Sequence, residues 1–218
     1  MNSGAFHLPA YFDYLATFAW ALSGAIVGLR KRFDIVGVFV LALLTSMGGS
    51  ILRDGVFLQR PPPVLTGQLY LPLILAATFI TAALRARIAH LKVVDQLVAA
   101  IDAIGTPAFA VVGMQLALGA GVPLPGVILV GAVSGVGGGV LRDLIVRDIP
   151  FILQPGQFSA LVVLLACVAF LSFTLGLQLP TEASAWSTIA LSFVVRMLTI
   201  RYNWRTREIG RASCRERV

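Results

Sequence analysis

Charged residues are scarce in this chain: Asp, Glu, Lys and Arg together make up 12% of its 218 residues. A soluble domain has about 25% charged and about 45–50% apolar residues. Here 58% of the residues are hydrophobic, and the mean hydropathy is +0.89. A soluble fold of this length cannot bury so much apolar surface. The composition therefore predicts an integral membrane protein.

Residue types that perform catalysis or bind metals are also few. The two histidines, His7 and His90, lie near the edges of apolar segments, and Cys167 and Cys214 show no metal-ligand spacing. The sequence has no Gly-rich phosphate loop, no HExxH and no nucleophile elbow. We therefore expect a protein that is not an enzyme and that holds no metal or other cofactor. The net charge of +7 does not predict a nucleic-acid partner, because the basic residues form short clusters between apolar segments.

Long apolar segments are what the sequence has in abundance. A transmembrane helix needs about 20 mostly apolar residues, and seven segments meet this need, at about 11–29, 35–58, 69–86, 95–119, 124–146, 158–179 and 185–204. The pattern predicts an all-α integral membrane protein whose single transmembrane domain covers residues 10–204. Residues 205–218 are interpreted as a polar tail, which sequence added by an expression vector would also explain.

Basic residues predict the orientation of this domain. Ten Lys and Arg residues lie at or just after the ends of the first, third, fifth and seventh segments, whereas the other loops hold only Arg60. The ten are Arg30, Lys31, Arg32, Arg85, Arg87, Lys92, Arg147, Arg201, Arg205 and Arg207. Loops rich in Lys and Arg stay in the cytoplasm. We therefore expect a multi-pass protein of the plasma membrane, with its N-terminus outside and its C-terminus in the cytoplasm.

An internal repeat organises the seven segments. TSMGGSILRD at 45–54 and SGVGGGVLRD at 134–143 lie 89 positions apart, and the same offset relates Asp13 to Asp102 and Gly24 to Gly113. Three helices therefore repeat, and an odd number makes the second copy inverted in the membrane. We expect repeat one at about 10–90, repeat two at about 95–180 and a seventh helix at about 185–204.

The glycine clusters within the repeat have two interpretations. Paired Gly-interrupted helices mark the site near the midplane in many membrane proteins with inverted repeats, so the glycines are candidates for a kink or unwound turn at a permeation path. Close helix packing is the alternative, which the spacing of Gly131, Gly135 and Gly139 also fits. Nearby hydroxyls either line the path or donate to the preceding turn of their own helix. The candidate pore residues are Gly48, Gly49, Gly138, Gly139, Thr45, Ser46, Ser50 and Ser134.

An Arg-Asp pair ends each copy of the motif: Arg53 with Asp54, and Arg142 with Asp143. A charge buried in the bilayer costs at least about 2.5–3.5 kcal/mol, so such residues face a cavity or form ion pairs. Because neighbours on a helix point in different directions, we expect each residue to find its partner elsewhere. The alternative is that both pairs snorkel to the membrane interface.

Three further charged residues lie within the apolar segments. Asp13 and Asp102 begin the first helix of each repeat, where an aspartate stabilises the positive helix end; the alternative is a vestibule that attracts cations. Arg196, near the end of the seventh segment, is expected to snorkel to the basic cytoplasmic face.

The motifs GGSILRD and GGGVLRD, followed by QRPPPVL and RDIPFIL, resemble the bacterial group of the trimeric intracellular cation (TRIC) channel family. The resemblance implies a homotrimer in membrane lipid, with a pore in each protomer that conducts potassium and sodium ions. It implies that helices two and five frame this pore and bend at Gly48, Gly49, Gly138 and Gly139. In such a cation pore, Arg53 must be neutralised, as must its counterpart in repeat two, so we expect both arginines to pair and to hold the bent helices. A secondary transporter for a small solute such as glycine is the main alternative function, and a purely structural membrane protein is another.

Overall fold

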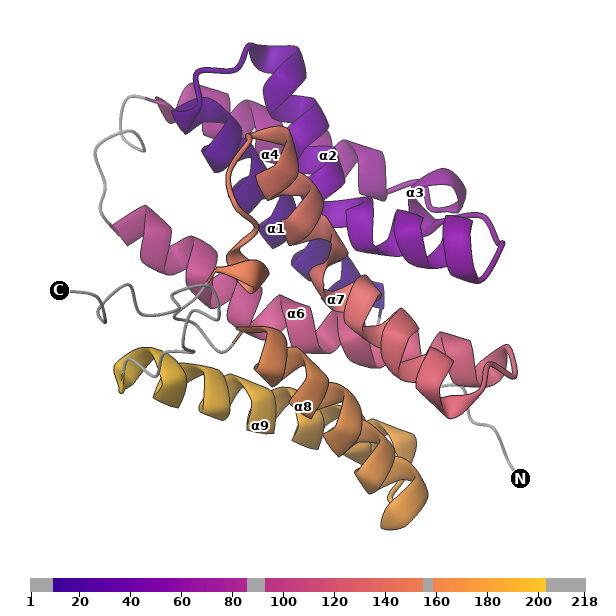
Figure 1. Ribbon diagram of the computed structural model, residues 1–218. Coiled ribbons are helices and arrows are strands. Elements are labelled where there is room, and N and C mark those ends of the chain that lie inside the picture. Colours follow the sequence, from indigo (N-terminus) through magenta and orange to yellow (C-terminus); the bar gives the residue numbers. More distant parts are fainter. Residues whose placement is uncertain (1–9, 86–92, 155–158, 203–218) are drawn as a thin grey trace, which may run out of the picture.

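The computed structural model describes residues 10–85, 93–154 and 159–202. These residues form helices joined by turns and irregular segments. They hold seven helices of 13 residues or more, each in the place of a predicted segment (Figure 1). These helices are α1 (Ala10–Arg30), α2 (Ile35–Leu52), α4 (Tyr70–Ala83), α6 (Val93–Gly119), α7 (Leu124–Ile145), α8 (Ser159–Leu171) and α9 (Thr181–Arg201). The polar tail predicted at 205–218 lies outside the described residues.

Short helical segments connect or extend these helices. A π-helical turn, η1 (Arg53–Phe57), continues α2, and another, η3 (Ser172–Gly176), continues α8. The helix α3 (Pro63–Thr66) and the 3-10 turn η2 (Phe151–Leu153) lie in connections. The side chain of Asp34 caps α2 by accepting a hydrogen bond from the Gly37 amide at 2.8 Å.

Three stretches of the described chain are long and apolar enough, by length and composition, to cross a membrane: Ile35–Phe57, Val98–Gly119 and Leu124–Ile145. The helical segments Tyr70–Ala83 and Ala160–Gly176 are apolar but shorter. The predicted third segment, 69–86, is thus represented by a helix that ends at Ala83. The structure therefore supports a helical membrane protein, while the crossing of all seven helices stays a prediction.

The helices form two groups of three with the same internal packing. In one group α1, α2 and α4 pack on one another, and in the other α6, α7 and α8 do so. The groups meet where α2 packs on α7 and where α1 packs on α6. Helix α9 packs on α6 and α8, and all three lie together in the lower part of Figure 1.

Equivalent turns connect the first two helices of each group. After α1, the amides of residues 31, 32 and 33 donate to the carbonyls of residues 27, 29 and 28. After α6, the amides of residues 120, 121 and 122 donate to the carbonyls of residues 116, 118 and 117, which is the same pattern 89 positions later. Arg32 and Gly121 both have a positive φ, of 61° and 74°, as the residue that ends a helix in this way commonly does. The repeat in sequence is therefore also a repeat in backbone structure.

Candidate functional site

Glycines of the two motif copies meet where α2 crosses α7. A Cβ atom placed on Gly49 would overlap the carbonyl oxygen of Ser134, and one placed on Gly138 would overlap the carbonyl oxygen of Thr45. The 89-residue offset relates Gly49 to Gly138 and Thr45 to Ser134, so the two contacts are reciprocal. Reciprocal contacts of this kind are what a two-fold axis produces. The crossing therefore has the contacts that a pseudo-two-fold axis between the repeats would produce.

The remaining glycines of the motif divide between this crossing and a pocket. A Cβ atom on Gly48 would lie 3.3 Å from the Cα of Gly138, and one on Gly137 would lie 2.9 Å from the Cα of Gly49. Gly139 faces away from the crossing, because its Cβ would meet only the Arg142 Nη2 atom, at 4.0 Å. The sequence analysis named Gly139 and not Gly137 among the candidate pore residues, whereas Gly137 is the one that packs against Gly49 at the crossing. The 89-residue offset pairs Gly48 with Gly137 and Gly49 with Gly138, whereas Gly139 corresponds to Ser50, so the repeat itself held the signal for Gly137.

Both helices keep α-helical geometry through their glycines. The unwound turn that the sequence suggested at these positions is therefore not found there, since α2 leaves α geometry only at Arg53, where η1 begins. Close packing is what the glycines provide in the structure. Gly131 and Gly135 extend this packing towards the start of α7, against Ala110 and Thr106 of α6. A bend at the glycines stays a prediction.

The hydroxyl groups near the crossing are engaged by the protein itself. Thr45, Ser46 and Ser50 are buried, and each donates to a backbone carbonyl three or four residues earlier, at 2.6, 2.8 and 2.8 Å. Ser134 differs, because its hydroxyl accepts a hydrogen bond from the Nη1 atom of Arg53 at 3.3 Å. Thr45, Ser46 and Ser50 of α2 therefore follow the second interpretation, in which a hydroxyl donates to the preceding turn of its own helix. Ser134 instead connects the two repeats.

Arg53 pairs with its own neighbour in sequence. Its Nε and Nη2 atoms donate to the two carboxylate oxygens of Asp54 at 2.8 and 2.6 Å, and both residues are buried. The Nε atom of Arg60 reaches the same carboxylate at 2.7 Å. The expectation that Arg53 and Asp54 find their partners elsewhere is therefore wrong for this pair. The long arginine side chain folds back onto the next residue at the turn where α2 becomes π-helical.

Arg142 makes the corresponding pair with Asp143 at 2.9 Å, so that expectation is wrong in the second repeat also. Its Nη1 atom lies 3.6 Å from a carboxylate oxygen of Asp102 and donates to the Ser23 hydroxyl at 3.1 Å. Arg53 is 2% exposed and Arg142 is 5% exposed, so neither extends to the protein surface as the snorkelling alternative required. Both guanidinium groups face carboxylates, while their role in holding bent helices stays a prediction.

The two matched aspartates have different partners. The hydroxyl of Tyr70 donates to the Asp13 carboxylate, which links α1 to the start of α4. Asp102 instead faces Arg142 by the ion pair described above. The vestibule role of Asp13 and Asp102 stays a prediction, and the structure shows that the two sites are not equivalent.

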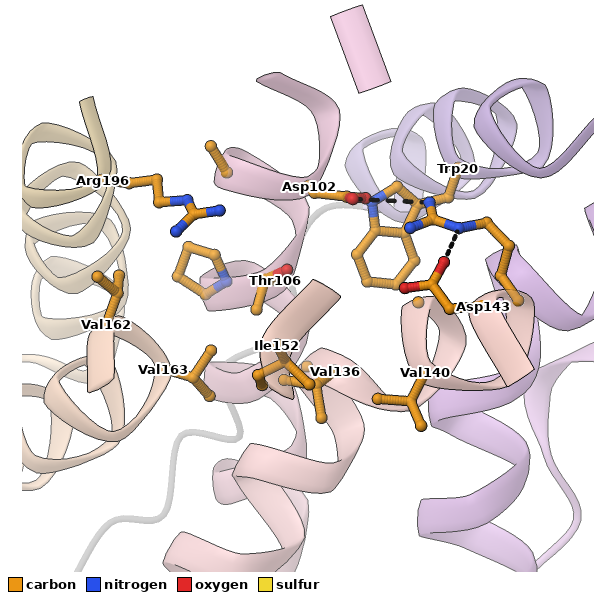
Figure 2. A pocket seen from close by; sticks show the side chains of 15 residues that line it. Trp20, Asp102, Thr106, Val136, Val140, Asp143, Ile152, Val162, Val163 and Arg196 are labelled. Atoms are coloured by element: carbon orange, nitrogen blue, oxygen red, sulfur yellow. Dashed lines mark hydrogen bonds and ion pairs between the residues drawn. The ribbon is translucent and has the colours of Figure 1, made fainter. Parts of the chain in front are cut away.

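A pocket of about 70 Å³ lies beside Asp102 and Arg142. Figure 2 shows Arg196 reaching into it from α9, across from Asp102 and Asp143. Arg196 is 5% exposed, so the expectation that it snorkels to the cytoplasmic face is wrong. Trp20 of α1 closes another side, where it stacks on Phe109 with ring centroids 4.8 Å apart. Within the described residues, no group of three or more His, Cys, Asp or Glu could hold a metal ion.

Comparison with known proteins gives the family of this chain. A family model described as "Glycine transporter" matches residues 10–86 and 99–174. A solved structure described as "Crystal structure of a prokaryotic TRIC channel in 0.5 M KCl" is 30% identical, with a TM-score of 0.79 over 90% of this chain and 98% of that chain. The chain belongs to the prokaryotic TRIC family. The resemblance predicted from the doubled motif is thus confirmed.

Other TRIC structures and relatives agree with this assignment. The structure described as "Structural basis for conductance through TRIC cation channels" is 27% identical, with a TM-score of 0.81 over 93% of this chain and 97% of that one. A "UPF0126 membrane protein" of Deinococcus radiodurans is 37% identical over 140 residues, which is 64% of each chain and so just under two thirds of the relative's length. The "UPF0126 inner membrane protein YadS" of Escherichia coli is 25% identical over 90% of this chain and 93% of its own. This TRIC protein is therefore a membrane protein.

The sequence analysis did not name Trp20 and did not connect Arg196 with Asp102, although both line the pocket of this TRIC protein. Trp20 and Arg196 lie in the first and last helices, far in sequence from Asp102. The one available signal was the spacing of polar residues along the seventh segment, where Arg196 follows Ser192 and Thr188 at intervals of four.

Proposed function

We propose that this protein is a channel for monovalent cations, chiefly potassium and also sodium. The observation that carries the proposal is the near-complete structural likeness to solved TRIC channels, one of them described as a cation channel and one as being in KCl. By the same likeness we propose a homotrimer with one pore in each protomer. The absence of enzymes among these relatives' descriptions supports a role without covalent chemistry.

The pore runs, in this proposal, along the pseudo-two-fold axis between α2 and α7. Gly48, Gly49 and Gly138 lie at its waist, and Thr45, Ser46, Ser50, Ser134 and Gly139 lie near it. The helix backbones touch at Gly49 and Gly138, so an ion cannot pass between them as they stand. Conduction therefore requires α2 and α7 to move apart at this level.

Cation passage also requires that the buried arginines present little positive charge to the ion. Arg53 faces Asp54, and Arg142 faces both Asp143 and Asp102. Each guanidinium is therefore balanced by at least one carboxylate in direct contact, which lowers the repulsion of a nearby cation. In the proposal these pairs hold the ends of α2 and α7 and do not select the ion.

The topology belongs to the same proposal. Residues 10–204 form one transmembrane domain of seven helices, with two inverted three-helix repeats and α9 as the additional helix. The reciprocal contacts at the α2–α7 crossing support the inversion, and the basic loops support an outside N-terminus and a cytoplasmic C-terminus in the plasma membrane.

A green fluorescent protein fused to the C-terminus will fluoresce in bacteria, whereas an alkaline phosphatase fusion at the same position will be inactive. The opposite pair of results would reverse the orientation.

Recording from purified protein in planar bilayers tests the channel. In a potassium gradient we expect discrete ohmic current steps that reverse near the potassium equilibrium potential. A matched bilayer with protein denatured before reconstitution controls for detergent leaks. The absence of any current from well-folded, reconstituted protein would refute the channel. Chemical crosslinking in mild detergent tests the assembly separately, and we expect it to give a trimer band.

Glycine transport is a second candidate function, because the family model that matches most of the chain is described as "Glycine transporter". Liposomes loaded with unlabelled glycine distinguish it from the channel. Saturable uptake of labelled glycine by counterflow, without single-channel steps, would favour the transporter. A pathway that passes only ions predicts no accelerated exchange of glycine.

A further inference from the structure

One face of α9 carries polar residues at a regular spacing. Ser184, Thr188, Ser192 and Arg196 follow one another at intervals of four and therefore share one face of the helix. All four are buried, with exposures of 0, 0, 0 and 5%. Because α9 packs on α6 and α8, this polar face, the α9 stripe, belongs to the protein interior. An apolar face would be the ordinary choice for such packing.

The hydroxyls of the α9 stripe differ from the bonded hydroxyls of α2 and α4, and within the described part of the chain they share the lack of a partner with the isolated residues Thr17 and Thr81. Ser184, Thr188 and Ser192 have no hydrogen-bond partner among the described residues. Thr78 of α4, equally buried, donates to the carbonyl four residues earlier at 2.9 Å. A buried hydroxyl without a partner costs about 1–3 kcal/mol, and such groups are commonly satisfied by ordered water. Three in succession therefore indicate a seam that water or a polar solute reaches.

The seam leads to the charged pocket. Ala185 shares a buried cluster with Met114 and Ala117, whereas Arg196 lines the pocket with Asp102. Helix α9 therefore runs antiparallel to α6, as Figure 1 also shows. The stripe thus extends from the start of α9 towards Arg196, and Ser192 lies one turn before the pocket. Gln115 of α6, whose side-chain oxygen and nitrogen both lack partners among the described residues, adds polar groups near the other end.

The pocket presents charges of both signs. Two carboxylates, of Asp102 and Asp143, and two guanidinium groups, of Arg142 and Arg196, line it. Figure 2 shows Arg196 on one side, across from Asp102 and Asp143. Arg142 joins these two carboxylates by its ion pairs. A lone cation would face two guanidinium groups here, and a lone anion would face two carboxylates. A ligand with separated positive and negative ends matches both sides.

We propose that this pocket binds a small zwitterionic amino acid and that the α9 stripe is its hydrated approach. The ligand's carboxylate lies toward Arg196 and its ammonium group toward Asp102 and Asp143. One water needs roughly 10–15 Å³ of such space, so about 70 Å³ holds about five non-hydrogen atoms, the number in glycine. Valine and tryptophan side chains around the pocket leave no room for a large side chain. The site is distinct from the α2–α7 crossing, so it stands or falls independently of ion conduction.

Cysteine accessibility tests both parts of the proposal. The natural cysteines are replaced (Cys167→Ala and Cys214→Ala), and Ser192→Cys is introduced into the purified full-length protein. A small methanethiosulfonate reagent is then applied, and the modified fraction is measured by intact-protein mass spectrometry. The control is Thr78→Cys, which replaces an equally buried hydroxyl whose hydrogen bond stays within its own helix. We expect Ser192→Cys to react at least about tenfold faster than the control, which corresponds to about 1.4 kcal/mol in accessibility.

Protection by ligand tests the assignment of the pocket. Glycine at millimolar concentration will slow the modification of Ser192→Cys, whereas methylamine, acetate and potassium chloride at equal concentration will not. Gly139→Leu, added to Ser192→Cys, fills the pocket from a position with no backbone neighbour close to a new Cβ. It will abolish protection while the cysteine stays reactive. Asp102→Asn will do the same through the loss of charge.

Each contrary outcome overturns one part of the proposal, either the hydrated approach or the ligand in the pocket. Equal reactivity of Ser192→Cys and Thr78→Cys would overturn the hydrated approach. Rapid modification without protection by glycine would overturn the ligand assignment, as would equal protection by acetate or methylamine. Protection that persists in folded Gly139→Leu protein would place the ligand outside this pocket. Ion currents recorded from the same variants report on the channel separately.

Discussion

Adjacent glycines in α7 are expected to respond to alanine in opposite directions. A Cβ atom on Gly138 would overlap the backbone carbonyl of Thr45, and the backbone cannot yield as a flexible side chain can. Overpacking of this kind costs about 1–3 kcal/mol. A Cβ atom on Gly139 would have only the Arg142 Nη2 atom near it, at 4.0 Å. Gly139→Ala therefore stabilises the helix by up to about 1 kcal/mol, the difference in helix propensity.

Thermal unfolding of the detergent-solubilised protein, followed by the loss of the folded peak in size-exclusion chromatography, measures the difference. A change of 1 kcal/mol shifts Tm by roughly 2–4 °C in a chain of this length, so a difference of about 1–4 kcal/mol between the two variants corresponds to about 2–16 °C. The reciprocal variant Gly49→Ala will cost about as much as Gly138→Ala. The double variant will cost less than the sum, because one separation of α2 from α7 relieves both overlaps.

Equal Tm values for Gly138→Ala and Gly139→Ala would refute the packing argument, since both substitutions change the same residue type within one turn. Full additivity of Gly49→Ala and Gly138→Ala would refute the shared relief, and with it the reciprocal crossing. Unchanged Tm in all variants would mean that α2 and α7 do not touch at these residues.

The ion pairs give three further predictions. Arg142→Gln will destabilise the protein by about 3–5 kcal/mol, because the buried carboxylate of Asp143 and the half-buried one of Asp102 lose a guanidinium partner. Arg53→Gln will cost less, because Arg60 still contacts the Asp54 carboxylate at 2.7 Å. Tm in detergent measures both changes. In bilayers, Arg53→Gln will keep cation selectivity, and an inverted reversal potential would contradict its structural role. Lys31→Ala removes the exposed ion pair with Asp148 at 2.7 Å. It will change the free energy of unfolding by less than about 1 kcal/mol at moderate salt. A larger loss in the same Tm measurement would mean that this pair holds the two repeats together.

The sequence was sufficient to predict the helical framework, because apolar length and repeated motifs are local properties of the chain. Each predicted segment has a helix in the structure. Helix α1 matches the bounds predicted for the first segment within one residue, and α2 together with η1 ends one residue before the predicted end of the second. The predicted third segment is longer than α4 because hydropathy does not detect the turn at Leu84. The 89-residue offset also relates backbone contacts that sequence alone did not show, at Gly49 and Gly138.

The partners of charged residues were beyond sequence reasoning. The directions of neighbouring side chains on a helix suggested that Arg53 and Asp54 would part, yet arginine is long and flexible enough to turn back onto the adjacent carboxylate. The pocket was harder still, because α1, α6, α7 and α9 all contribute to it. A pattern within one helix cannot reveal that Arg196 and Trp20 converge on the same space.

The two repeats are alike in backbone and unlike in polar contacts, and this difference bears on where each function lies. At the crossing, Gly49 and Gly138 make matched contacts, so a path along the axis meets the same surface from either side. Away from it, Asp13 is bonded to a neutral tyrosine hydroxyl, whereas Asp102 faces a guanidinium group. Helix α9 packs on α6 and α8 of the second group and adds Arg196 there. A dipolar solute needs an oriented site, and the additional helix supplies the charge that gives the second repeat such an orientation.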